Sequence, residues 1–301
     1  MRSVSIATTQ MSCTADRAEN IRRACALVEE AAARGAQIVL LQELFETPYF
    51  CIERDPRHFA EATPLAANPA VAALKPLAAR LKVVVPVCFY ELGDDGKRYN
   101  SVAIIDADGS VLGIYRKSHI PDFPAYEEAF YFAPGNTGFK VWDTAYARIG
   151  VGICWDQWFP EAARIMALEG AEILLYPTAI GRPVRGETNE ARNSKPHWQQ
   201  AMQGHAAANQ VIVAAANRIG NESGGQFETQ FYGGSFIADP TGGKVLELGE
   251  TMPGVGVMSF DLDEYSLARH RWGIYRTRRR DLYEPVLTRA APDYLMVRRD
   301  D

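Results

Sequence analysis

Three residues that together could carry out acyl transfer each follow a short apolar stretch of the sequence. Such stretches are typical of buried strands, and in α/β folds the carboxyl ends of strands are where functional sites assemble. Glu43 could act as a base, Lys117 as a cationic donor and Cys154 as a nucleophile, which are the parts that acyl transfer requires. The apolar stretches and the residues that follow them are 38–41 with Glu43, 111–115 with Lys117, and 148–153 with Cys154.

Cys154 stands where the predicted strand 148–153 gives way to a predicted helix. Pro160 suits a first helical position, and Glu161 belongs to the first turn. A thiol at such a junction can be held clear of the sheet, next to backbone N–H groups that stabilise a thiolate or an oxyanion. The alternative is a small buried hydrophobe, which is what most free cysteines are. The other candidate residues favour the functional interpretation.

The remaining candidates have structural alternatives too, and the histidines offer a competing nucleophile pair. Glu43 could cap a helix, and Lys117 could be a solvated loop residue. A histidine can also activate a cysteine, and His119 and His205 are the two candidate partners of Cys154. Sequence spacing leaves this Cys–His pairing open.

Strand and helix patterns alternate along the chain, with hairpin turns between some of the strands. No linker-like change of composition, repeat or low-complexity tract divides the chain, which favours one α/β domain over residues 1–301, with a mixed sheet or a pair of sheets rather than a TIM barrel. The expected strands are 4–7, 38–41, 83–90, 99–105, 111–115, 148–153, 173–176, 211–216, 232–238, 244–248 and 255–260. Four helices are expected. One is capped by Thr14 or Asp16, one begins at Asn68-Pro69, and two span 160–169 and 196–209.

Three segments show no clear periodic pattern of hydrophobic residues. Residues 120–138 are rich in Pro, Gly and aromatic residues, and a long ordered loop of this kind is often functional. Residues 181–195 are polar and read as a surface loop. Residues 269–301 carry many arginines and suggest an extended arm, or alternatively a solvated surface.

Composition narrows the class of protein further. The chain has 301 residues, 47% of them hydrophobic, and a net charge of −5, so it can bury a large core and has no basic excess for binding nucleic acid or an anionic membrane. Its five cysteines are scattered, which favours reduced thiols in the cytoplasm over disulfides or a metal site. We expect neither a signal peptide nor a membrane span.

Three blocks of the sequence resemble the signature blocks of the nitrilase superfamily of carbon–nitrogen hydrolases, in the same order and at similar separations. The blocks are Leu41-Gln42-Glu43-Leu44-Phe45, Tyr115-Arg116-Lys117-Ser118-His119 and Gly152-Ile153-Cys154-Trp155-Asp156. The resemblance extends from about Ser5 to about Thr288 and is closest to the branch of N-carbamoylputrescine amidohydrolases. It implies a four-layer α-β-β-α sandwich and a homo-oligomer built from dimers, in which the arm 269–301 contacts a neighbouring subunit.

The resemblance also implies roles for the candidate residues. Cys154 is the expected nucleophile, Glu43 the general base and Lys117 the cation that stabilises the oxyanion. A second glutamate that positions the lysine or the water falls on Glu128, with its neighbour Glu127 as the weaker candidate. No metal or organic cofactor is expected.

N-carbamoylputrescine, the expected substrate, carries a ureido group at one end and an ammonium at the other. A buried ammonium needs a carboxylate or aromatic faces. We expect Trp155 and Tyr126 to form walls of its pocket and Asp122 to pair with its charge, although Asp122 could equally be a turn residue; Glu187 is a further acidic residue nearby in sequence.

Two other functions stay open. The first is a ureidopropionase-like enzyme or another amidase of the superfamily that acts on a carboxylate-bearing substrate. Such relatives tend to carry an arginine just after the nucleophile, where this chain has Trp155, although Arg182 and Arg185 follow in the next loop. The second is a catalytically silent scaffold of the same fold, which the presence of all three candidate residues argues against.

Overall fold

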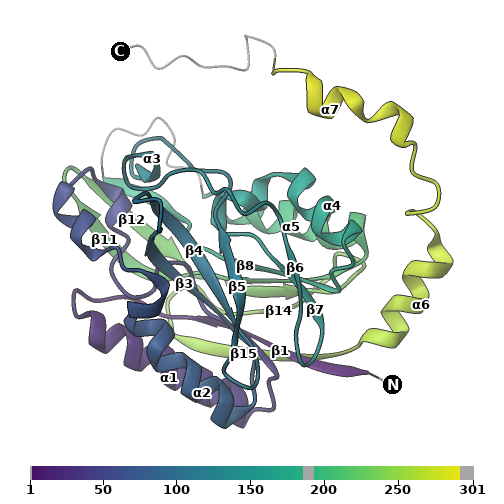
Figure 1. Cartoon of the computed structure of the whole chain (residues 1–301), viewed down its shortest axis with the longest axis horizontal. Coiled ribbons are helices and arrows are strands. Elements are labelled where there is room, and N and C mark those ends of the chain that lie inside the picture. The colour runs from purple at the N-terminus through teal and green to yellow at the C-terminus, as the bar shows by residue number, and fades with distance from the viewer. Residues whose placement is uncertain (1, 186–192, 292–301) are drawn as a thin grey trace.

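Two β-sheets face each other at the centre of this computed structural model, which describes residues 2–185 and 193–291 (Figure 1). The first sheet consists of two three-stranded groups that a parallel bridge between Ile38 and Val84 joins edge to edge. Its strands lie in the order β15 (Gly254–Asp261), β1 (Ser3–Gln10), β2 (Ile38–Leu40), then β3 (Val85–Leu92), β4 (Arg98–Ile105) and β5 (Val111–Arg116). The second has the order β14 (Lys244–Glu247), β13 (Phe236–Ala238), β10 (Ile212–Ala216), β8 (Ile173–Pro177), β7 (Arg148–Val151) and β6 (Val141–Asp143).

Helices cover the outer faces of the two sheets. Helices α1 (Arg17–Ala33) and α2 (Pro69–Leu81) lie against the first sheet, and α4 (Pro160–Leu168) and α5 (Lys195–Asn209) against the second. Three large hydrophobic clusters separate the four layers: one between the two sheets, one beneath α1 and α2, and one beneath α4 and α5. The four-layer α-β-β-α sandwich that the sequence predicts is therefore confirmed.

Local sequence signals set the ends of the helices as expected. Asp16 caps α1 by accepting a hydrogen bond from the backbone N–H of Glu19 at 3.0 Å. Asn68 caps α2 in the same way, and Pro69 occupies the first turn, where its missing N–H costs no helical hydrogen bond. Lys82 ends α2 in the left-handed conformation, with φ of +54°.

Residues 181–185 form a strand, which corrects this part of the surface loop predicted over 181–195; residues 186–192 of that prediction lie outside the described residues. Strand β9 (Gly181–Arg185) pairs with β12 (Phe227–Tyr232), which also pairs with β11 (Ile219–Gly224) in a small third sheet. Gly and Pro in Gly181–Arg185 conceal the strand because both are poor strand formers. Gly181 is nevertheless required, since a Cβ there would lie 2.4 Å from the carbonyl oxygen of Gln230.

Two further segments differ from their expected form. The loop 120–138 contains one short helix, α3 (Glu128–Tyr131), and Cys154–Trp158 forms a 3₁₀ turn, η4, between β7 and α4. The C-terminal arm begins within α6 (Leu262–Trp272), continues to α7 (Glu284–Thr288), and runs outside the sandwich at the right of Figure 1. No helix in the described ranges is both long enough and apolar enough to cross a membrane.

Candidate active site

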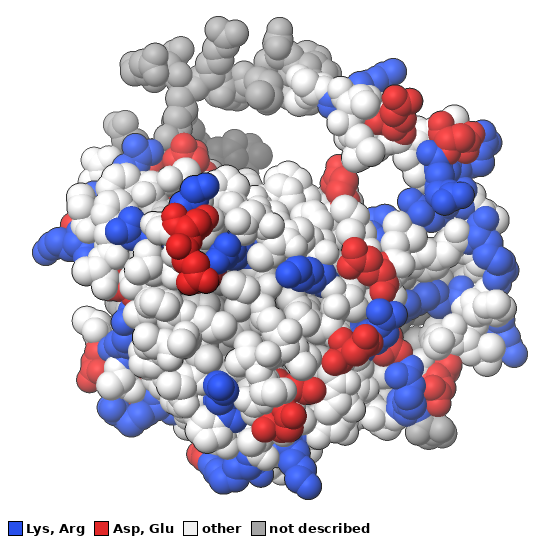
Figure 2. All heavy atoms as spheres, viewed as in Figure 1, with Lys and Arg blue, Asp and Glu red and all other residues white. Residues whose placement is uncertain are grey.

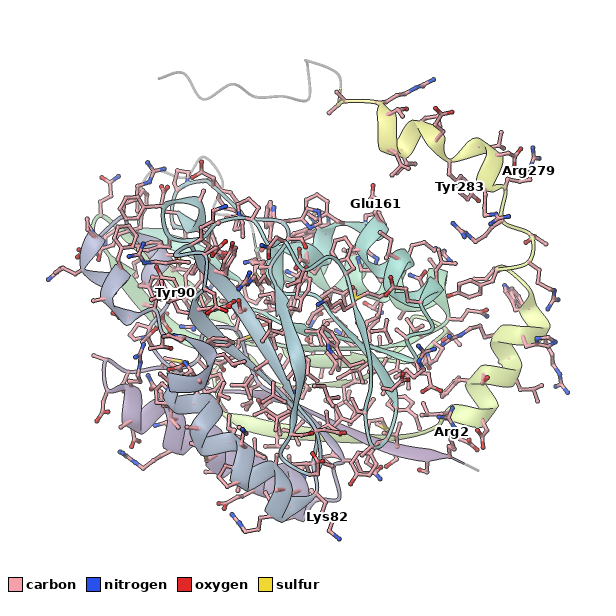
Figure 3. The ribbon with its side chains drawn as sticks, viewed as in Figure 1. Arg2, Lys82, Tyr90, Glu161, Arg279 and Tyr283 are labelled. Atoms are coloured by element: carbon pink, nitrogen blue, oxygen red, sulfur yellow. The ribbon has the colours of Figure 1, made fainter. Side chains whose placement is uncertain are left out.

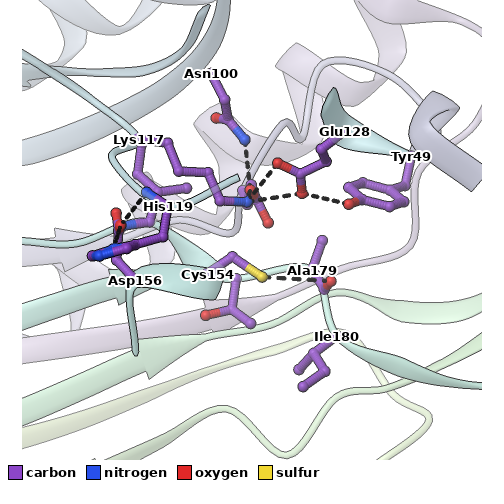
Figure 4. A network of polar contacts seen from close by, with 12 residues as sticks. Tyr49, Asn100, Lys117, His119, Glu128, Cys154, Asp156, Ala179 and Ile180 are labelled. Carbon is purple, nitrogen blue, oxygen red and sulfur yellow. Dashed lines mark hydrogen bonds and ion pairs between the residues drawn. The ribbon is translucent and has the colours of Figure 1, made fainter. Parts of the chain in front are cut away.

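Four reactive side chains lie together where strands of both sheets end. Glu43 follows β2. Lys117 follows β5 and Cys154 follows β7, while Glu128 comes from α3 (Figure 4). Glu43, Lys117 and Glu128 are fully buried, and Cys154 is 4% exposed. The sandwich thus brings together all four residues that the sequence singled out for catalysis. Two follow strands of the first sheet, one follows a strand of the second sheet, and one lies on the segment that connects the two sheets.

The Lys117 ammonium joins the two glutamates. Its Nζ lies 2.9 Å from Oε1 of Glu43 and 2.8 and 2.7 Å from the two carboxylate oxygens of Glu128. Burial acts to lower the pKa of Lys117, but the carboxylates of Glu128 and Glu43 outweigh this, so the pKa lies well above its ordinary value. Lys117 is therefore charged in the resting site.

Glu43 is oriented by one amide and keeps one oxygen available. Asn100 donates a hydrogen bond from Nδ2 to Oε1 of Glu43 at 2.6 Å, the same oxygen that Lys117 contacts. The other oxygen, Oε2, is buried and accepts no hydrogen bond from any described residue. A buried carboxylate oxygen without a donor is suited to take up a proton during the reaction.

Cys154 occupies a backbone conformation that a cysteine rarely adopts. Its φ of +42° places it in the left-handed region at the start of η4, so the chain turns sharply as it leaves β7. The thiol donates to the carbonyl oxygen of Ala179 at 3.7 Å. Burial raises the pKa of the thiol well above its ordinary value, the Glu43 carboxylate adds to this, and Lys117 opposes it. The resting nucleophile is therefore a protonated thiol, and the proton has to leave when sulfur attacks.

The raised pKa predicts the pH dependence of alkylation at Cys154. Because burial and the neighbouring carboxylates disfavour the charged form, the thiolate fraction should keep growing as pH rises above neutrality. We expect the rate of Cys154 labelling by iodoacetamide to increase continuously from about pH 6 to about pH 9, by at least about 10-fold. Peptide mass spectrometry gives this rate. A plateau reached below about pH 7, as a preformed thiolate–imidazolium pair would give, would contradict the assignment.

Glu128 is anchored from the side opposite Lys117. The hydroxyl of Tyr49 donates to Oε1 of Glu128 at 2.5 Å. Burial raises the pKa of Glu128 above the usual carboxyl range, although the Lys117 ammonium acts to lower it. The neighbouring Glu127 instead pairs with Arg54, its carboxylate lying 2.6 Å from the guanidinium. The geometry therefore agrees with ranking Glu128 above Glu127.

Neither candidate histidine contacts the nucleophile. His119 shares a hydrogen bond of 2.7 Å between its Nδ1 and Oδ1 of Asp156, and His205 lies 2.7 Å from the backbone oxygen of Gln157. No hydrogen bond joins either ring to Cys154 in the described structure. The geometry thus favours the base Glu43 over a Cys–His pair.

Asp156 connects the turn that carries Cys154 with the segment around Lys117 through hydrogen bonds. Its fully buried carboxylate accepts hydrogen bonds from the backbone N–H of Ile153 at 2.9 Å, the hydroxyl of Tyr115 at 2.7 Å and the backbone N–H of His119 at 3.0 Å. These residues come from the end of β7 and from both sides of Lys117. Sequence reasoning missed this role, and also those of Asn100 and Tyr49. An acid two positions after the nucleophile was the one local signal that could have identified Asp156.

A cavity of about 390 Å³ opens beside Cys154. Trp155 and Tyr126 line it, as predicted from their place in the sequence, and the hydroxyl of Tyr126 accepts a hydrogen bond from the backbone N–H of Gly181 at 2.9 Å. Its described lining contains no Arg, Lys, Asp or Glu. The lining residues are Pro121, Phe123, Pro124, Ala125, Tyr126, Cys154, Trp155, Gln157, Trp158, Ile180, Gly181, Pro183 and Ser194.

The predicted charge partner Asp122 lies outside this lining. Its carboxylate instead lies 3.4 Å from the guanidinium of Arg54 in an exposed ion pair. Arg54 comes from a distant segment of the chain, so this ion pair could not be seen from the sequence around the catalytic blocks. Glu187 lies outside the described residues. Arg182 donates to Gln230 and also lies outside the lining, as does Arg185.

One group of possible metal ligands stands apart from the catalytic cluster. Glu53, Asp55 and His58 have ligand atoms within 4.8 Å of one another. Asp55 is already paired with Arg57, and His58 with Glu61 at 2.7 Å, so two of the three are held by other partners. None of the three residues belongs to the catalytic cluster.

Comparison with known proteins identifies the family. Residues 5–270 match the carbon–nitrogen hydrolase family, so the chain belongs to that family. It is 52% identical over 291 residues to the N-carbamoylputrescine amidase of Solanum tuberosum, covering 95% of this chain and 96% of the relative. It is 46% identical over 287 residues to the citrullinase of Francisella tularensis, covering 95% and 99%. A carbon–nitrogen hydrolase from Helicobacter pylori has a crystal structure that is similar with a TM-score of 0.88 and 34% sequence identity, over 96% of this chain and 100% of that one.

Proposed function

We propose that this enzyme hydrolyses N-carbamoylputrescine to putrescine, carbon dioxide and ammonia. The observation that carries the proposal is the cavity beside Cys154, whose described lining is aromatic and holds no cationic side chain that could pair with a carboxylate. The 52% identity to an N-carbamoylputrescine amidase over nearly the whole chain supports the same substrate.

The catalytic cluster supports a two-stage thiol mechanism. The sulfur of Cys154 attacks the carbamoyl carbon while its proton passes to Oε2 of Glu43, which gives a tetrahedral oxyanion. Collapse breaks the C–N bond to the leaving nitrogen, which departs with the proton from Glu43, and leaves a thioester-like acyl enzyme. Water then attacks this carbon and gives a proton to Glu43, the C–S bond breaks as Glu43 returns that proton to sulfur, and the carbamate that is released decomposes to carbon dioxide and the remaining amine or ammonia.

Lys117 and the nucleophile turn supply the oxyanion donors. At rest, the Lys117 ammonium directs its donors at one oxygen of Glu43 and both oxygens of Glu128. Because Glu128 is held through both oxygens, Lys117 can turn one N–H toward the oxyanion and keep the other contact. The backbone N–H of Trp155, directly after the nucleophile, supplies a second donor. One such donor is typically worth about 10²–10³ in rate.

Aromatic walls suit the alkylammonium end of the substrate. The ring centroids of Phe123 and Trp155 lie 5.2 Å apart, and those of Trp155 and Trp158 lie 6.2 Å apart. Faces of this kind attract a desolvated ammonium through the ring quadrupole, by about 0.5–2 kcal/mol for each well-placed ring. A carboxylate in the same place would find no paired cation among the described lining residues.

Citrulline is the second candidate substrate, because the citrullinase of Francisella tularensis is 46% identical to this chain. It carries the same ureido group as N-carbamoylputrescine and an ammonium, with an additional carboxylate. The two candidates therefore differ in the one group for which the described cavity has no counter-charge.

An ammonia-release assay over matched ureides tests the proposal. We expect kcat/KM to be highest for N-carbamoylputrescine, and about 10- to 100-fold lower for n-butylurea, which lacks the ammonium. N-carbamoyl-β-alanine should be hydrolysed more slowly than either. Equal or better turnover of that compound would move the enzyme to the ureidopropionase-like alternative, and a preference for citrulline would identify a citrullinase.

Replacing Trp155 tests the aromatic wall within the same assay. Trp155→Leu keeps an apolar side chain but removes the ring, so kcat/KM for N-carbamoylputrescine should fall by about 5- to 20-fold. The value for n-butylurea is the matched control and should change much less. A parallel loss for both substrates would show that Trp155 shapes the cavity without recognising the charge.

We further propose that the enzyme is a homo-oligomer built from dimers, assembled through its C-terminal arm, residues 269–301. The described part of the arm presents large apolar side chains to solvent, with Trp272 75% exposed and Leu287 88% exposed. Tyr283 and Arg279 lie on the arm, across from Glu161 at the start of α4 (Figure 3), and basic side chains gather along it (Figure 2). A cleft of about 920 Å³ separates the arm from α4 and α5.

Truncation before Arg269 should disturb assembly more than chemistry. The described part of the arm, up to residue 291, contributes no residue to the catalytic cluster, but it carries apolar surface that a second subunit can cover. Size-exclusion chromatography with light scattering should therefore show a smaller particle than the full chain. An unchanged particle mass would remove the arm from the interface.

We also propose a cytoplasmic location. All five cysteines are free thiols, and the nucleophile itself must stay reduced. A reducing compartment preserves them in that state.

A further inference from the structure

A buried ion pair lies beneath the catalytic cluster and takes no part in the mechanism described above. Arg218, at the start of the segment that follows β10, is fully buried, and Glu222 on β11 is 8% exposed. Nη1 of Arg218 lies 2.7 and 3.0 Å from the two carboxylate oxygens of Glu222. An ion pair this deep is costly to desolvate, and similar apolar packing would serve stability at least as well.

Arg218 holds the turn that presents the general base. Its Nη2 donates to the backbone oxygens of Glu43 and Leu44, both at 3.0 Å. Leu44 has a φ of +45°, in the left-handed region that a leucine seldom occupies. The guanidinium therefore fixes two successive carbonyls on either side of a strained residue, directly behind the carboxylate of Glu43. The planar fork of arginine lets Nη2 hold these two carbonyls while Nη1 holds the Glu222 carboxylate.

The other half of the pair supports the second glutamate. The Glu222 carboxylate accepts a hydrogen bond from the backbone N–H of Tyr49, and the hydroxyl of Tyr49 donates to Glu128 at 2.5 Å. The guanidinium of Arg218 also lies 5.7 Å from the centroid of the Tyr49 ring. One ion pair thus reaches Glu43 through the backbone and Glu128 through Tyr49, and these are the two carboxylates that flank Lys117.

Asn217 links the same unit to the nucleophile. Its Oδ1 accepts hydrogen bonds from the backbone N–H groups of Ile180 and Arg218, both at 2.9 Å, and its Nδ2 donates to the backbone oxygen of Ile180 at 2.9 Å. Ile180 follows Ala179, whose carbonyl oxygen accepts the Cys154 thiol. Asn217 and Arg218, which directly follow β10, therefore contact both the segment Ala179-Ile180 beside the thiol and the backbone at Glu43.

We propose that Arg218 and Glu222 form a positioning clamp, which keeps Glu43 and Glu128 at the distances that proton transfer and lysine contact require. The clamp rests on the catalytic roles given under the proposed function. It touches no reacting atom, so its loss should weaken proton removal from Cys154 without changing the cavity that binds substrate.

Arg218→Gln tests the clamp, with Arg269→Gln as the matched control. Arg269 is a half-buried arginine that also donates to backbone carbonyls, those of Gln210 and Ala171, but far from the catalytic cluster. We expect Arg218→Gln to lower kcat by about 10- to 100-fold with KM changed less than about 3-fold, since positioning acts on the transition state. Arg269→Gln should keep kcat within about 2-fold.

Iodoacetamide labelling of Cys154 separates positioning from simple destabilisation and needs no substrate, so it stays informative even if the proposed substrate is wrong. At neutral pH the thiol is protonated and needs Glu43 to accept its proton as sulfur attacks the reagent, so a misplaced base should slow labelling there by about 5-fold or more, and this loss should outweigh the weaker repulsion between the Glu43 carboxylate and a thiolate. A loosened structure would expose the thiol and speed labelling instead. An unchanged or faster rate in Arg218→Gln would overturn the proposal.

If Arg218→Gln does not fold, two milder variants test the positioning clamp instead. Arg218→Lys keeps the buried charge but loses the fork, and Glu222→Gln keeps a hydrogen-bond acceptor for Tyr49 but loses the charge. Each should slow labelling and lower kcat by about 3- to 10-fold, with Arg218→Lys less impaired than Arg218→Gln whenever both fold. Wild-type rates in both variants would overturn the clamp.

Discussion

Cys154→Ala should abolish turnover and leave the fold intact. The thiol is the protein group that bonds to the carbamoyl carbon in the mechanism, so its removal should lower kcat by at least about 10⁴-fold. Loss of one buried sulfur should cost only about 1 kcal/mol of unfolding free energy, because the cavity left behind is small. The φ of +42° at this position is as unfavourable for alanine as it is for cysteine. The substitution therefore adds no backbone strain.

A second buried cysteine provides the matched control. Cys88 is 1% exposed and packs in the core between the sheets, so Cys88→Ala removes the same atoms from a similar environment. It should keep most of its activity and show a similar shift in the thermal unfolding midpoint. Cys154→Ser should be as inactive as Cys154→Ala, because a hydroxyl is a far weaker acid than a thiol. Residual turnover by Cys154→Ala within about 10-fold of wild type would refute covalent catalysis by this residue.

The position of the catalytic residues could be predicted because it follows from local patterns. Glu43, Lys117 and Cys154 each terminate a short apolar run, and the tendency of α/β folds to gather such ends made their convergence an expectation before any geometry was known. The roles of these residues and the four-layer sandwich were predicted from the resemblance of the surrounding sequence blocks to the nitrilase superfamily. Glu128 could be found only through that resemblance, because its four-residue helix is too short to show a periodic pattern of hydrophobic residues.

The supporting residues could not be predicted because their contacts join distant parts of the chain. Asn100 reaches Glu43 across 57 positions, and Tyr49 reaches Glu128 across 79. Arg218 contacts the backbone of Glu43 across 175 positions. In the sequence these residues look like ordinary strand or loop residues, and only tertiary packing shows that their polar atoms are buried and paired.

The ion pair of Asp122 likewise joins distant parts of the chain. Its closeness in sequence to Lys117 suggested a place in the substrate pocket, but Arg54, 68 positions away, lies beside its carboxylate instead. The strand β9 was missed for a related reason. Its Gly and Pro predict a loop, yet β12 supplies a pairing partner that satisfies the backbone, and pairing outweighs local propensity.

Removing the Lys117 charge should separate its catalytic role from its structural one. Lys117→Met keeps much of the side-chain volume but leaves Glu43 and Glu128 buried without their shared cation. Breaking a buried ion pair in this way typically costs about 3–5 kcal/mol of stability. We expect a lower thermal unfolding midpoint, and a kcat that falls by at least about 10²-fold because the oxyanion loses a charged donor.

The double variant Lys117→Met/Glu128→Gln distinguishes the two effects. Glu128→Gln removes one carboxylate charge, which restores the net charge of the buried cluster to its original value, and the amide can still accept a hydrogen bond from Tyr49. The unfolding midpoint should therefore recover most of its loss, while kcat stays at least about 10²-fold below wild type because the oxyanion donor is still missing. Glu128→Gln alone completes the cycle and should retain more activity than either variant that lacks the lysine. If the double variant regained both stability and turnover, Lys117 would only balance the charge of its two neighbours, and the oxyanion would have to be stabilised by other groups.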